Sequence, residues 1–143
     1  MRPINYIVIH CTATQSDVTI ESIKRYWKEN LKWKNPGYHY MIKADGEIVN
    51  TLPIDQISNG VAGWNSQIIN ISYIGGIDKS NHPKDTRTQE QKKSIVKLLR
   101  ELKSKFPKAR IQGHRDFPNV HKACPSFDAK KEYSELLINR LKD

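Results

Sequence analysis

A short apolar stretch near the start of the chain constrains the fold more than any other feature. Residues 5–11 read Asn-Tyr-Ile-Val-Ile-His-Cys, a run rich in β-branched side chains, which is typical of a buried strand. A buried strand needs other strands beside it and apolar cover on its faces. The 143 residues contain no internal repeat and no low-complexity segment, so we expect one domain over residues 1–143.

Three helices are predicted from apolar residues at helical spacing behind capping signals. Thr19 is a candidate N-cap for the first helix, Thr88 begins a capping box with Gln91 for the second, and Asp128 can cap the last. The side chains that we expect on the buried faces are Ile20, Ile23, Trp27 and Leu31 in the first helix, Ile95, Leu98, Leu99, Leu102 and Phe106 in the second, and Tyr133, Leu136, Leu137 and Leu141 in the last.

Four more strands are predicted along the rest of the chain. A hairpin is expected, with strands over residues 38–43 and 47–51 around a turn at residues 44–46 (Ala-Asp-Gly). Single strands are expected over residues 70–75 and 109–113. Loops are expected over residues 12–18, 53–69 and 78–87, the last of them exposed. The order β-α-β-β-β-α-β-α predicts an α/β fold, with a mixed central sheet of about five strands flanked by helices.

The chain is basic, with a net charge of +9 and a pI of about 9.6. A basic surface favours polyanions, such as nucleic acid, anionic membranes or the polymers of a bacterial wall, and charge alone does not choose among them. We find no aromatic platform or recognition helix for nucleic acid and no apolar run long enough to span a membrane, so we expect neither partner. The first residues lack the pattern of a signal peptide, which predicts synthesis in the cytoplasm.

Two histidines and one cysteine are candidates for a metal site. His10 closes the first predicted strand, His114 follows the last one, and Cys124 lies ten positions later in a loop that contains Pro118 and Pro125. Two imidazoles and one thiolate hold a tetrahedral zinc ion with one open position, as catalytic zinc requires. The residues alone leave other roles open, because a histidine at a strand end or a lone cysteine is more often structural.

The alternation of side chains along a strand separates neighbouring candidates. Successive side chains point to opposite faces, so His10 shares a face with Val8, whereas Cys11 points the other way. We therefore expect Cys11 in the core. The same rule separates Tyr38 from His39: if one of them faces the site, the other does not.

Five short segments carry a resemblance to a known family. They are residues 9–14 (Ile-His-Cys-Thr-Ala-Thr), 37–42 (Gly-Tyr-His-Tyr-Met-Ile), 75–78 (Gly-Gly-Ile-Asp), 113–116 (Gly-His-Arg-Asp) and 122–128 (Lys-Ala-Cys-Pro-Ser-Phe-Asp). In this order they resemble the type-2 N-acetylmuramoyl-L-alanine amidases, which include small phage lysozymes and share their fold with animal peptidoglycan-recognition proteins. The resemblance extends from about residue 4 to residue 140.

The resemblance implies a zinc hydrolase with a metal cleft on one side of the sheet. It points to His10, His114 and Cys124 as the zinc ligands and to Tyr38 and Lys122 as catalytic residues. The implied reaction is hydrolysis of the amide bond between N-acetylmuramic acid and L-alanine in peptidoglycan. Zinc supplies the chemistry to activate water at neutral pH, and a lysine beside a ligand is suited to stabilise an oxyanion.

Other residues near these segments have weaker assignments. Trp64 and Asn65, in a Gly-Trp-Asn segment, are expected to line the substrate cleft, although Trp64 is nearly as well explained as a core residue. Asp116 either supports a ligating histidine or caps a turn. His121 is a candidate for a substrate contact or a bystander near the metal. Some phage relatives carry a histidine where this chain has residues 58–62 (Ser-Asn-Gly-Val-Ala), so no such role is expected here.

The resemblance leaves two functional hypotheses. The first is a zinc amidase that lyses the cell wall, most consistent with a phage or prophage endolysin that acts after release from the cytoplasm. The alternative is a non-catalytic peptidoglycan-binding module, in which the zinc cysteine is typically replaced. Because Cys124 is present, we favour the enzyme. We expect it to act as a monomer without a separate wall-binding domain.

Overall fold

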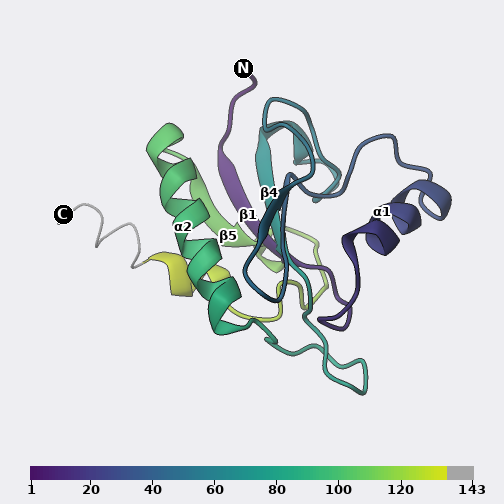
Figure 1. The fold of residues 1–143 in the computed structure, drawn as a ribbon. Coiled ribbons are helices and arrows are strands. Elements are labelled where there is room, and N and C mark those ends of the chain that lie inside the picture. The colour runs from purple at the N-terminus through teal and green to yellow at the C-terminus, as the bar shows by residue number, and fades with distance from the viewer. Residues whose placement is uncertain (135–143) are drawn as a thin grey trace.

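A five-stranded mixed sheet forms the centre of the molecule (Figure 1). In the computed structural model, which describes residues 1–134, the strand order is β3-β2-β4-β1-β5. The strands are β1 (Tyr6–Cys11), β2 (Tyr40–Ile42), β3 (Ile48–Asn50), β4 (Ile68–Tyr73) and β5 (Arg110–Gly113). β1 is parallel to β4 and β5, β2 is parallel to β4, and only the hairpin pair β2 and β3 is antiparallel. The predicted α/β fold with a mixed sheet is confirmed.

β1 is the central parallel strand, as its sequence predicts. It lies between β4 and β5, and Ile7, Val8 and Ile9 are fully buried. A parallel strand covered on both faces reads as an unbroken apolar run, which explains the β-branched stretch. In the register with β4, His10 stands opposite Ser72.

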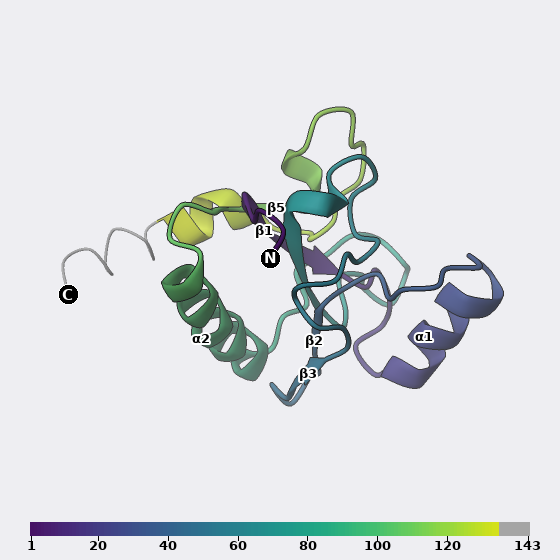
Figure 2. The same cartoon turned by 90° about the horizontal axis from the view of Figure 1, so that it is seen from above.

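Helices cover the two faces of the sheet unequally. The helices are α1 (Ile20–Glu29) and α2 (Gln89–Lys105), with a further helical stretch over residues 129–134 and the short 3₁₀ helices η1 (Asn65–Gln67) and η2 (His114–Asp116). Seen from above, α2 and residues 129–134 lie on one side of the sheet and α1 lies on the other (Figure 2). Among the described residues, no helix is long and apolar enough to cross a membrane.

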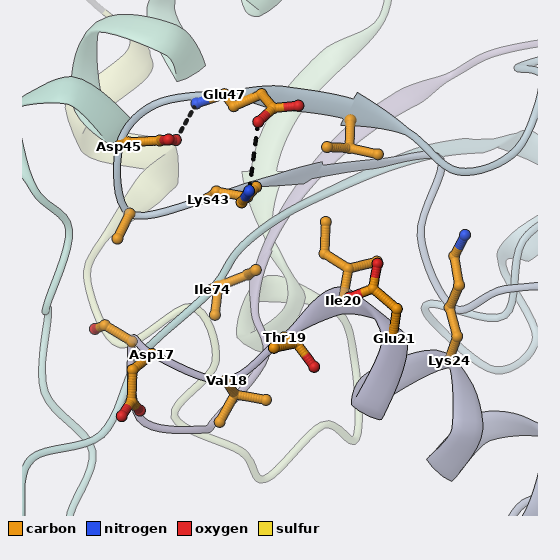
Figure 3. Close-up of a pocket in the computed structure, with 13 residues that line it drawn as sticks. Asp17, Val18, Thr19, Ile20, Glu21, Lys24, Lys43, Asp45, Glu47 and Ile74 are labelled. Atoms are coloured by element: carbon orange, nitrogen blue, oxygen red, sulfur yellow. Dashed lines mark hydrogen bonds and ion pairs between the residues drawn. The ribbon is translucent and has the colours of Figure 1, made fainter.

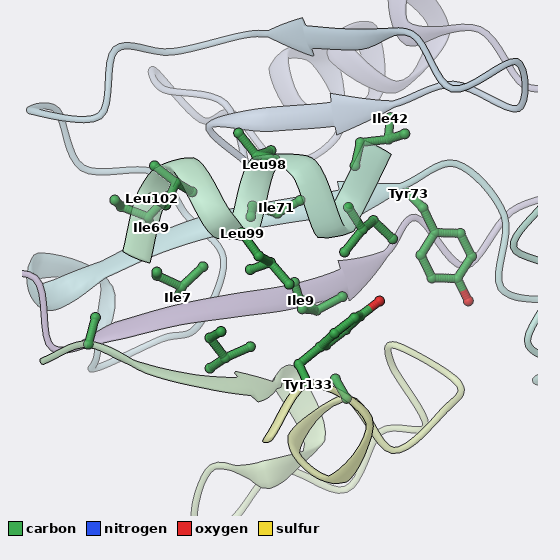
Figure 4. Packing of buried hydrophobic residues seen from close by; sticks show 14 of the residues in the cluster. Ile7, Ile9, Ile42, Ile69, Ile71, Tyr73, Leu98, Leu99, Leu102 and Tyr133 are labelled. Carbon is green, nitrogen blue, oxygen red and sulfur yellow. The ribbon is translucent and has the colours of Figure 1, made fainter. Parts of the chain in front are cut away.

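The main apolar core fills the space between the sheet and α2 (Figure 4). Isoleucines of β1 and β4 meet leucines of α2, and Tyr133 from residues 129–134 closes one end. The buried members labelled in the figure are Ile7, Ile9, Ile42, Ile69, Ile71, Tyr73, Leu98, Leu99, Leu102 and Tyr133. Cys11 belongs to this cluster, as strand alternation predicted.

The opposite face of the sheet is only partly apolar. One small cluster lies under α1 and another surrounds Val8 and Phe117. Between them the sheet presents His10, Asn70 and Ser72, all of which are buried. Buried polar groups need hydrogen-bond partners, so this face must contain an organised polar network.

The predicted capping signals are present. The Thr19 side chain accepts a hydrogen bond from the Ser22 N–H, and residues 88–91 form the reciprocal capping box at the start of α2. The Asp128 carboxylate accepts from the Lys131 N–H at the start of the last helical stretch. Of the predicted apolar face of that helix, Tyr133 is buried, and Leu136, Leu137 and Leu141 lie outside the described residues.

The first helix is shorter than predicted, and the prediction for Leu31 was wrong. α1 ends at Glu29, and Leu31 is exposed. The backbone N–H groups of Asn30 and Leu31 both donate to the Tyr26 carbonyl, and Lys32 adopts a left-handed conformation with φ 58°. The chain therefore turns away before Leu31 can reach the apolar face.

Several strand boundaries and one exposed loop also differ from the predictions. β2 covers residues 40–42 rather than 38–43, β3 covers 48–50 rather than 47–51, and β4 covers 68–73 rather than 70–75. Gly75 and Gly76 have φ values of 142° and 102°, a conformation that ends the regular strand before them. Residues 78–87 are not uniformly exposed, because Arg87 is buried. Its side chain forms ion pairs with Asp85 and Glu132, which the sequence does not reveal.

Candidate metal centre and active site

The three candidate metal ligands meet at one edge of the sheet. His10 is the second-last residue of β1, and His114 follows β5 directly. Because β1 and β5 are parallel, their carboxyl ends open onto the same side, where ligands of open α/β sheets bind. One nitrogen of each histidine and the Cys124 sulfur all lie within 4.8 Å of one another. The structure therefore brings together all three residues that the sequence singled out.

Hydrogen bonds from neighbouring backbone position Cys124. Its sulfur accepts from the Cys11 N–H at 3.2 Å, and its carbonyl accepts from the Arg115 N–H at 3.0 Å. The Tyr73 hydroxyl donates to the carbonyl of the next residue, Pro125, at 2.6 Å. Cys11 and Cys124 are both free, so the two cysteines form no disulfide.

The geometry of the three donor atoms suits a zinc ion. The His10 Nδ1 atom lies 3.9 Å from the Cys124 sulfur, and the two imidazole centroids are 4.8 Å apart. Tetrahedral zinc bonds of ordinary length place such donor atoms about 3.3–3.7 Å apart. The His10 Nε2 atom is engaged by the Asn70 Oδ1 atom at 2.7 Å, which leaves Nδ1 as the nitrogen that faces Cys124.

Both histidines are neutral at physiological pH. Burial, followed by the nearby His114, lowers the pKa of His10 to about 3. Burial and the neighbouring Lys122 charge lower the pKa of His114 to about 4. Contact with Cys11, together with burial, raises the pKa of the Cys124 thiol. A bound cation reverses the last effect, because it favours the thiolate.

A cavity opens directly onto the three candidate ligands. It has a volume of about 200 Å³ and is lined by His10, Cys11, Thr12, Ala13, Trp27, Trp33, Gly37, Tyr38, Asn59, Gly60, His114, Lys122 and Cys124. A second cavity of about 540 Å³ shares Trp33, Asn59, Gly60, His114 and Lys122 with the first. Since they share lining residues, the two form one groove that runs past the ligands.

The two predicted catalytic residues both line this groove. The Tyr38 hydroxyl donates to the Cys11 carbonyl at 3.3 Å, and the Tyr38 ring centroid is 5.1 Å from that of His10. Burial raises the pKa of Tyr38 well above its usual range, so the phenol stays protonated. Lys122 is exposed and lines both parts of the groove. His39 does not line it, in agreement with the alternation argument.

Trp64 combines the two roles that the sequence left open. Its ring packs at 5.7 Å from Tyr6 and 5.2 Å from Phe117, within a small apolar cluster. It also lines the larger part of the groove, as does His121.

Asn65 holds the groove wall rather than lining it. Its side-chain oxygen accepts from the N–H groups of Gly60 and Val61 at 3.1 and 2.7 Å. It thereby fixes the segment that forms one wall of both parts of the groove. Asp116 caps a turn, because its carboxylate accepts from the Gly113 N–H at 2.8 Å.

Several residues of the site escaped the sequence analysis. Trp33 and Asn59 line both parts of the groove. Asn70 contacts a candidate ligand from β4, and behind it lie Ser58 and His39. One signal was available for Asn70, because it is a polar side chain in an isoleucine-rich strand. The register of β4 with β1, which pairs Asn70 with Val8, places it on the same sheet face as His10.

Another cavity, of about 560 Å³, lies between the start of α1 and the β2–β3 hairpin (Figure 3). Its wall carries acidic and basic side chains, and the Lys43 ammonium pairs with the Glu47 carboxylate at 3.4 Å. Both side chains are about half exposed, so this ion pair contributes little stability. The cavity includes no candidate metal ligand.

Comparisons with known proteins agree with this geometry. The model of the N-acetylmuramoyl-L-alanine amidase family matches residues 1–127. The endolysin of Klebsiella phage KP32 is 36% identical over 137 residues, which cover 93% of this chain and 89% of that protein. The endolysin of Enterobacteria phage K11 is 35% identical over 125 residues, covering 86% and 81%.

Solved structures give the same result at the level of the fold. The Ph2119 endolysin from the Thermus scotoductus MAT2119 bacteriophage Ph2119 superposes with a TM-score of 0.80 at 27% identity, covering 96% of this chain and 86% of that one. Bumblebee PGRP-SA superposes with a TM-score of 0.78 at 21% identity, covering 96% and 84%, a likeness that concerns the fold alone. With a family match over most of its length, this chain belongs to the N-acetylmuramoyl-L-alanine amidases.

Proposed function

We propose that this protein is a phage-type endolysin that hydrolyses the amide bond between N-acetylmuramic acid and L-alanine with a zinc ion held by His10, His114 and Cys124. The observation that carries the proposal is the meeting of these three side chains at the carboxyl ends of β1 and β5, where they border an open groove. The relatives described as endolysins support the setting.

The donor set fits the metal and its use in catalysis. Two neutral imidazoles and one cysteine favour zinc and leave one coordination position open. A bound zinc ion polarises a carbonyl group and makes water a competent nucleophile near neutral pH. The groove beside the ligands, with Trp33 and Trp64 in its walls, offers aromatic surface to a sugar–peptide chain.

Tyr38 and Lys122 are suited to act on the scissile amide. The Lys122 side chain borders the groove next to His114 and carries a positive charge, which would stabilise negative charge on the carbonyl oxygen. The Tyr38 phenol remains a hydrogen-bond donor because its pKa is raised by burial. It is within reach of the same cavity, where it would orient the reacting groups.

Digestion of purified cell walls tests this proposal. The intact protein should release new L-alanine amino termini, and both a chelator and Cys124→Ala should abolish the release. His82→Ala is the matched control, because His82 is exposed and lies outside the groove, and it should retain full activity. Tyr38→Phe should lower kcat more than it raises KM.

Three outcomes would contradict the proposal or part of it. Release of reducing sugar instead of amino termini would identify a glycosidase. Binding to cell walls without any release, by protein loaded with zinc, would identify the non-catalytic binding module. Equal activity in Cys124→Ala and the intact protein would remove Cys124 from the metal site.

A further inference from the structure

We infer that a buried relay of His39, Ser58 and Asn70 positions His10 by fixing which of its ring nitrogens faces the metal. The inference rests on the proposed function in one respect, that His10 is a metal ligand. The three residues touch neither the substrate groove nor the metal ligands His114 and Cys124. They are positioning residues, which act through His10 alone.

The relay is a continuous chain of short contacts across the buried face of the sheet. His10 Nε2 lies 2.7 Å from Asn70 Oδ1, and Asn70 Nδ2 donates to Ser58 Oγ at 2.7 Å. Ser58 Oγ lies 3.1 Å from His39 Nδ1, and His39 Nε2 lies 2.7 Å from the Gln56 carbonyl. His10 is 1% exposed and the other three side chains are fully buried, so no water competes at these positions.

The direction of the relay is set at His39. The backbone N–H of Asn70 donates to His39 Nδ1 at 3.0 Å, and an N–H group can only donate. His39 Nδ1 is therefore an acceptor, and its proton is on Nε2, which donates to the Gln56 carbonyl at 2.7 Å. The Arg2 guanidinium lies 3.2 Å from the same Nε2 atom, but its hydrogens go to the carbonyls of Ile54 and Gln56 instead. Burial lowers the pKa of His39 to about 4, so the ring is neutral and this tautomer applies at physiological pH.

Every later hydrogen bond follows from that one. Because His39 Nδ1 carries no hydrogen, the Ser58 hydroxyl donates to it and shares its lone pair with the Asn70 N–H. The Ser58 oxygen is then free to accept from Asn70 Nδ2. The amide oxygen of Asn70 consequently points at His10 and accepts from Nε2–H. The lone pair of His10 is thereby confined to Nδ1, the nitrogen that faces Cys124.

The reversed relay cannot support a metal. Ser58 would donate to Asn70 Oδ1, and Asn70 Nδ2 would donate to His10 Nε2. The proton of His10 would then lie on Nδ1 and point toward the other ligands. This arrangement also loses the hydrogen bond from Ser58 to His39, so the observed direction satisfies more buried groups.

Gly60 and Asn65 hold Asn70 in place. A Cβ atom on Gly60 would lie 2.3 Å from Cγ of Asn70, so only glycine lets this segment close over the amide. Asn65 fixes the segment by accepting from the Gly60 N–H. The Asn70 side chain is therefore held in position by the groove wall as well as by its place in β4.

Zinc affinity, measured by competition with a chromophoric chelator, separates positioning from simple packing. Asn70→Leu should weaken zinc binding by about 10- to 100-fold. Asn70→Asp should stay within about threefold of the intact protein, because a carboxylate only accepts and so keeps the proton on His10 Nε2. Ser72→Ala is the matched control, since Ser72 is buried on β4 opposite His10 without bonding it, and it should bind zinc normally.

Two further arms make the test specific. Ser58→Ala should weaken zinc binding in the intact background but not in Asn70→Asp, because the aspartate no longer needs Ser58 to orient it. In the metal-free protein, ¹⁵N chemical shifts of the His10 ring should report the Nε2–H tautomer, with His10→Gln used for assignment. This measurement needs no metal and no activity, so it tests the relay even if the protein proves not to be a zinc enzyme.

The inference is overturned by any of three results. One is a His10 ring protonated on Nδ1 in the metal-free protein. Another is equal loss of zinc affinity in Asn70→Asp and Asn70→Leu, when both retain cooperative thermal unfolding. The third is a Ser58→Ala effect of the same size in both backgrounds.

Discussion

Arg87 joins the loop before α2 to residues 127–133, which follow α2 and β5 in the sequence. Its guanidinium donates to the carboxylates of Asp85 and Glu132 at 2.7–2.9 Å and to the Tyr133 hydroxyl at 2.8 Å. It also stacks on Phe127, with 3.4 Å to the ring centroid. The loop before α2 is thereby tied to residues 129–134 and to the segment that follows Cys124.

Replacement of Arg87 with methionine keeps most of the apolar volume and removes the charge and every hydrogen bond that the guanidinium donates. Breaking a fully buried ion pair costs about 3–5 kcal/mol, because the remaining charge has no partner. The Asp85 and Glu132 side chains are 32% and 44% exposed, so they regain water and the cost falls. We expect Arg87→Met to lower the free energy of unfolding by about 2–3 kcal/mol, which for a domain of this size lowers Tm by roughly 6–12 °C.

Thermal and urea unfolding of the metal-free protein at pH 7 measure this effect. Arg25→Met on the exposed face of α1 is the matched control and should change stability by less than about 0.5 kcal/mol. The pH dependence provides a second readout: hydrogen bonds from Arg87 lower the pKa of Glu132, so their stabilisation is lost as the pH falls below about 4.3. A Tm within 2 °C of the intact protein, or an equal loss in Arg25→Met, would refute this account.

Three other perturbations have defined outcomes. Burial lowers the pKa of His39 from 6.5 to about 4, so between pH 6.5 and pH 4 the unfolded chain binds a proton that the folded protein does not, and the free energy of unfolding should decrease as the pH drops. In urea titrations, His39→Gln should remove up to about 3 kcal/mol of this pH-dependent decrease. Tyr73→Phe leaves the Pro125 carbonyl without its buried donor and should cost about 1–2 kcal/mol in the same assay. Gly63→Ala, at φ 85° with open space around it, should lower the free energy of unfolding by only about 1 kcal/mol, measured by thermal unfolding. A Cβ atom on Gly46 would also lie 3.0 Å from Glu90, so Gly46→Ala should lower it by more.

Local patterns explain why the framework of the fold could be predicted. The β-branched run of β1, the capping box at residues 88–91 and the turn at residues 44–46 each depend on side chains close in sequence. The meeting of His10 and His114 also follows from simple rules, since both residues stand at the ends of predicted strands. The sequence did not predict that those strands are paired in parallel, which the structure shows.

Hydrogen bonds that no sequence pattern marks explain what could not be predicted. The ion pairs of Arg87 reach 45 residues along the chain to Glu132, and no periodicity or motif marks them. Leu31 fits the helical spacing of α1, but the helix ends first because its last N–H groups share the Tyr26 carbonyl. In both cases the deciding interaction is a hydrogen bond whose partner is set by the path of the chain.

The candidate site shows the same division within a few residues of sequence. Tyr38 and His39 are adjacent, and the alternation rule allows only one of them to face the site. The structure places Tyr38 in the groove, although both residues precede β2. It does not follow that the second is idle, because His39 reaches His10 from behind through Ser58 and Asn70. Buried polar side chains need hydrogen-bond partners. A buried polar residue that points away from the cavity, such as His39, is therefore a natural candidate for orienting one that lines it, such as His10. Side-chain alternation thus separates groove-lining residues from those behind them, and hydrogen-bond accounting assigns the latter their role.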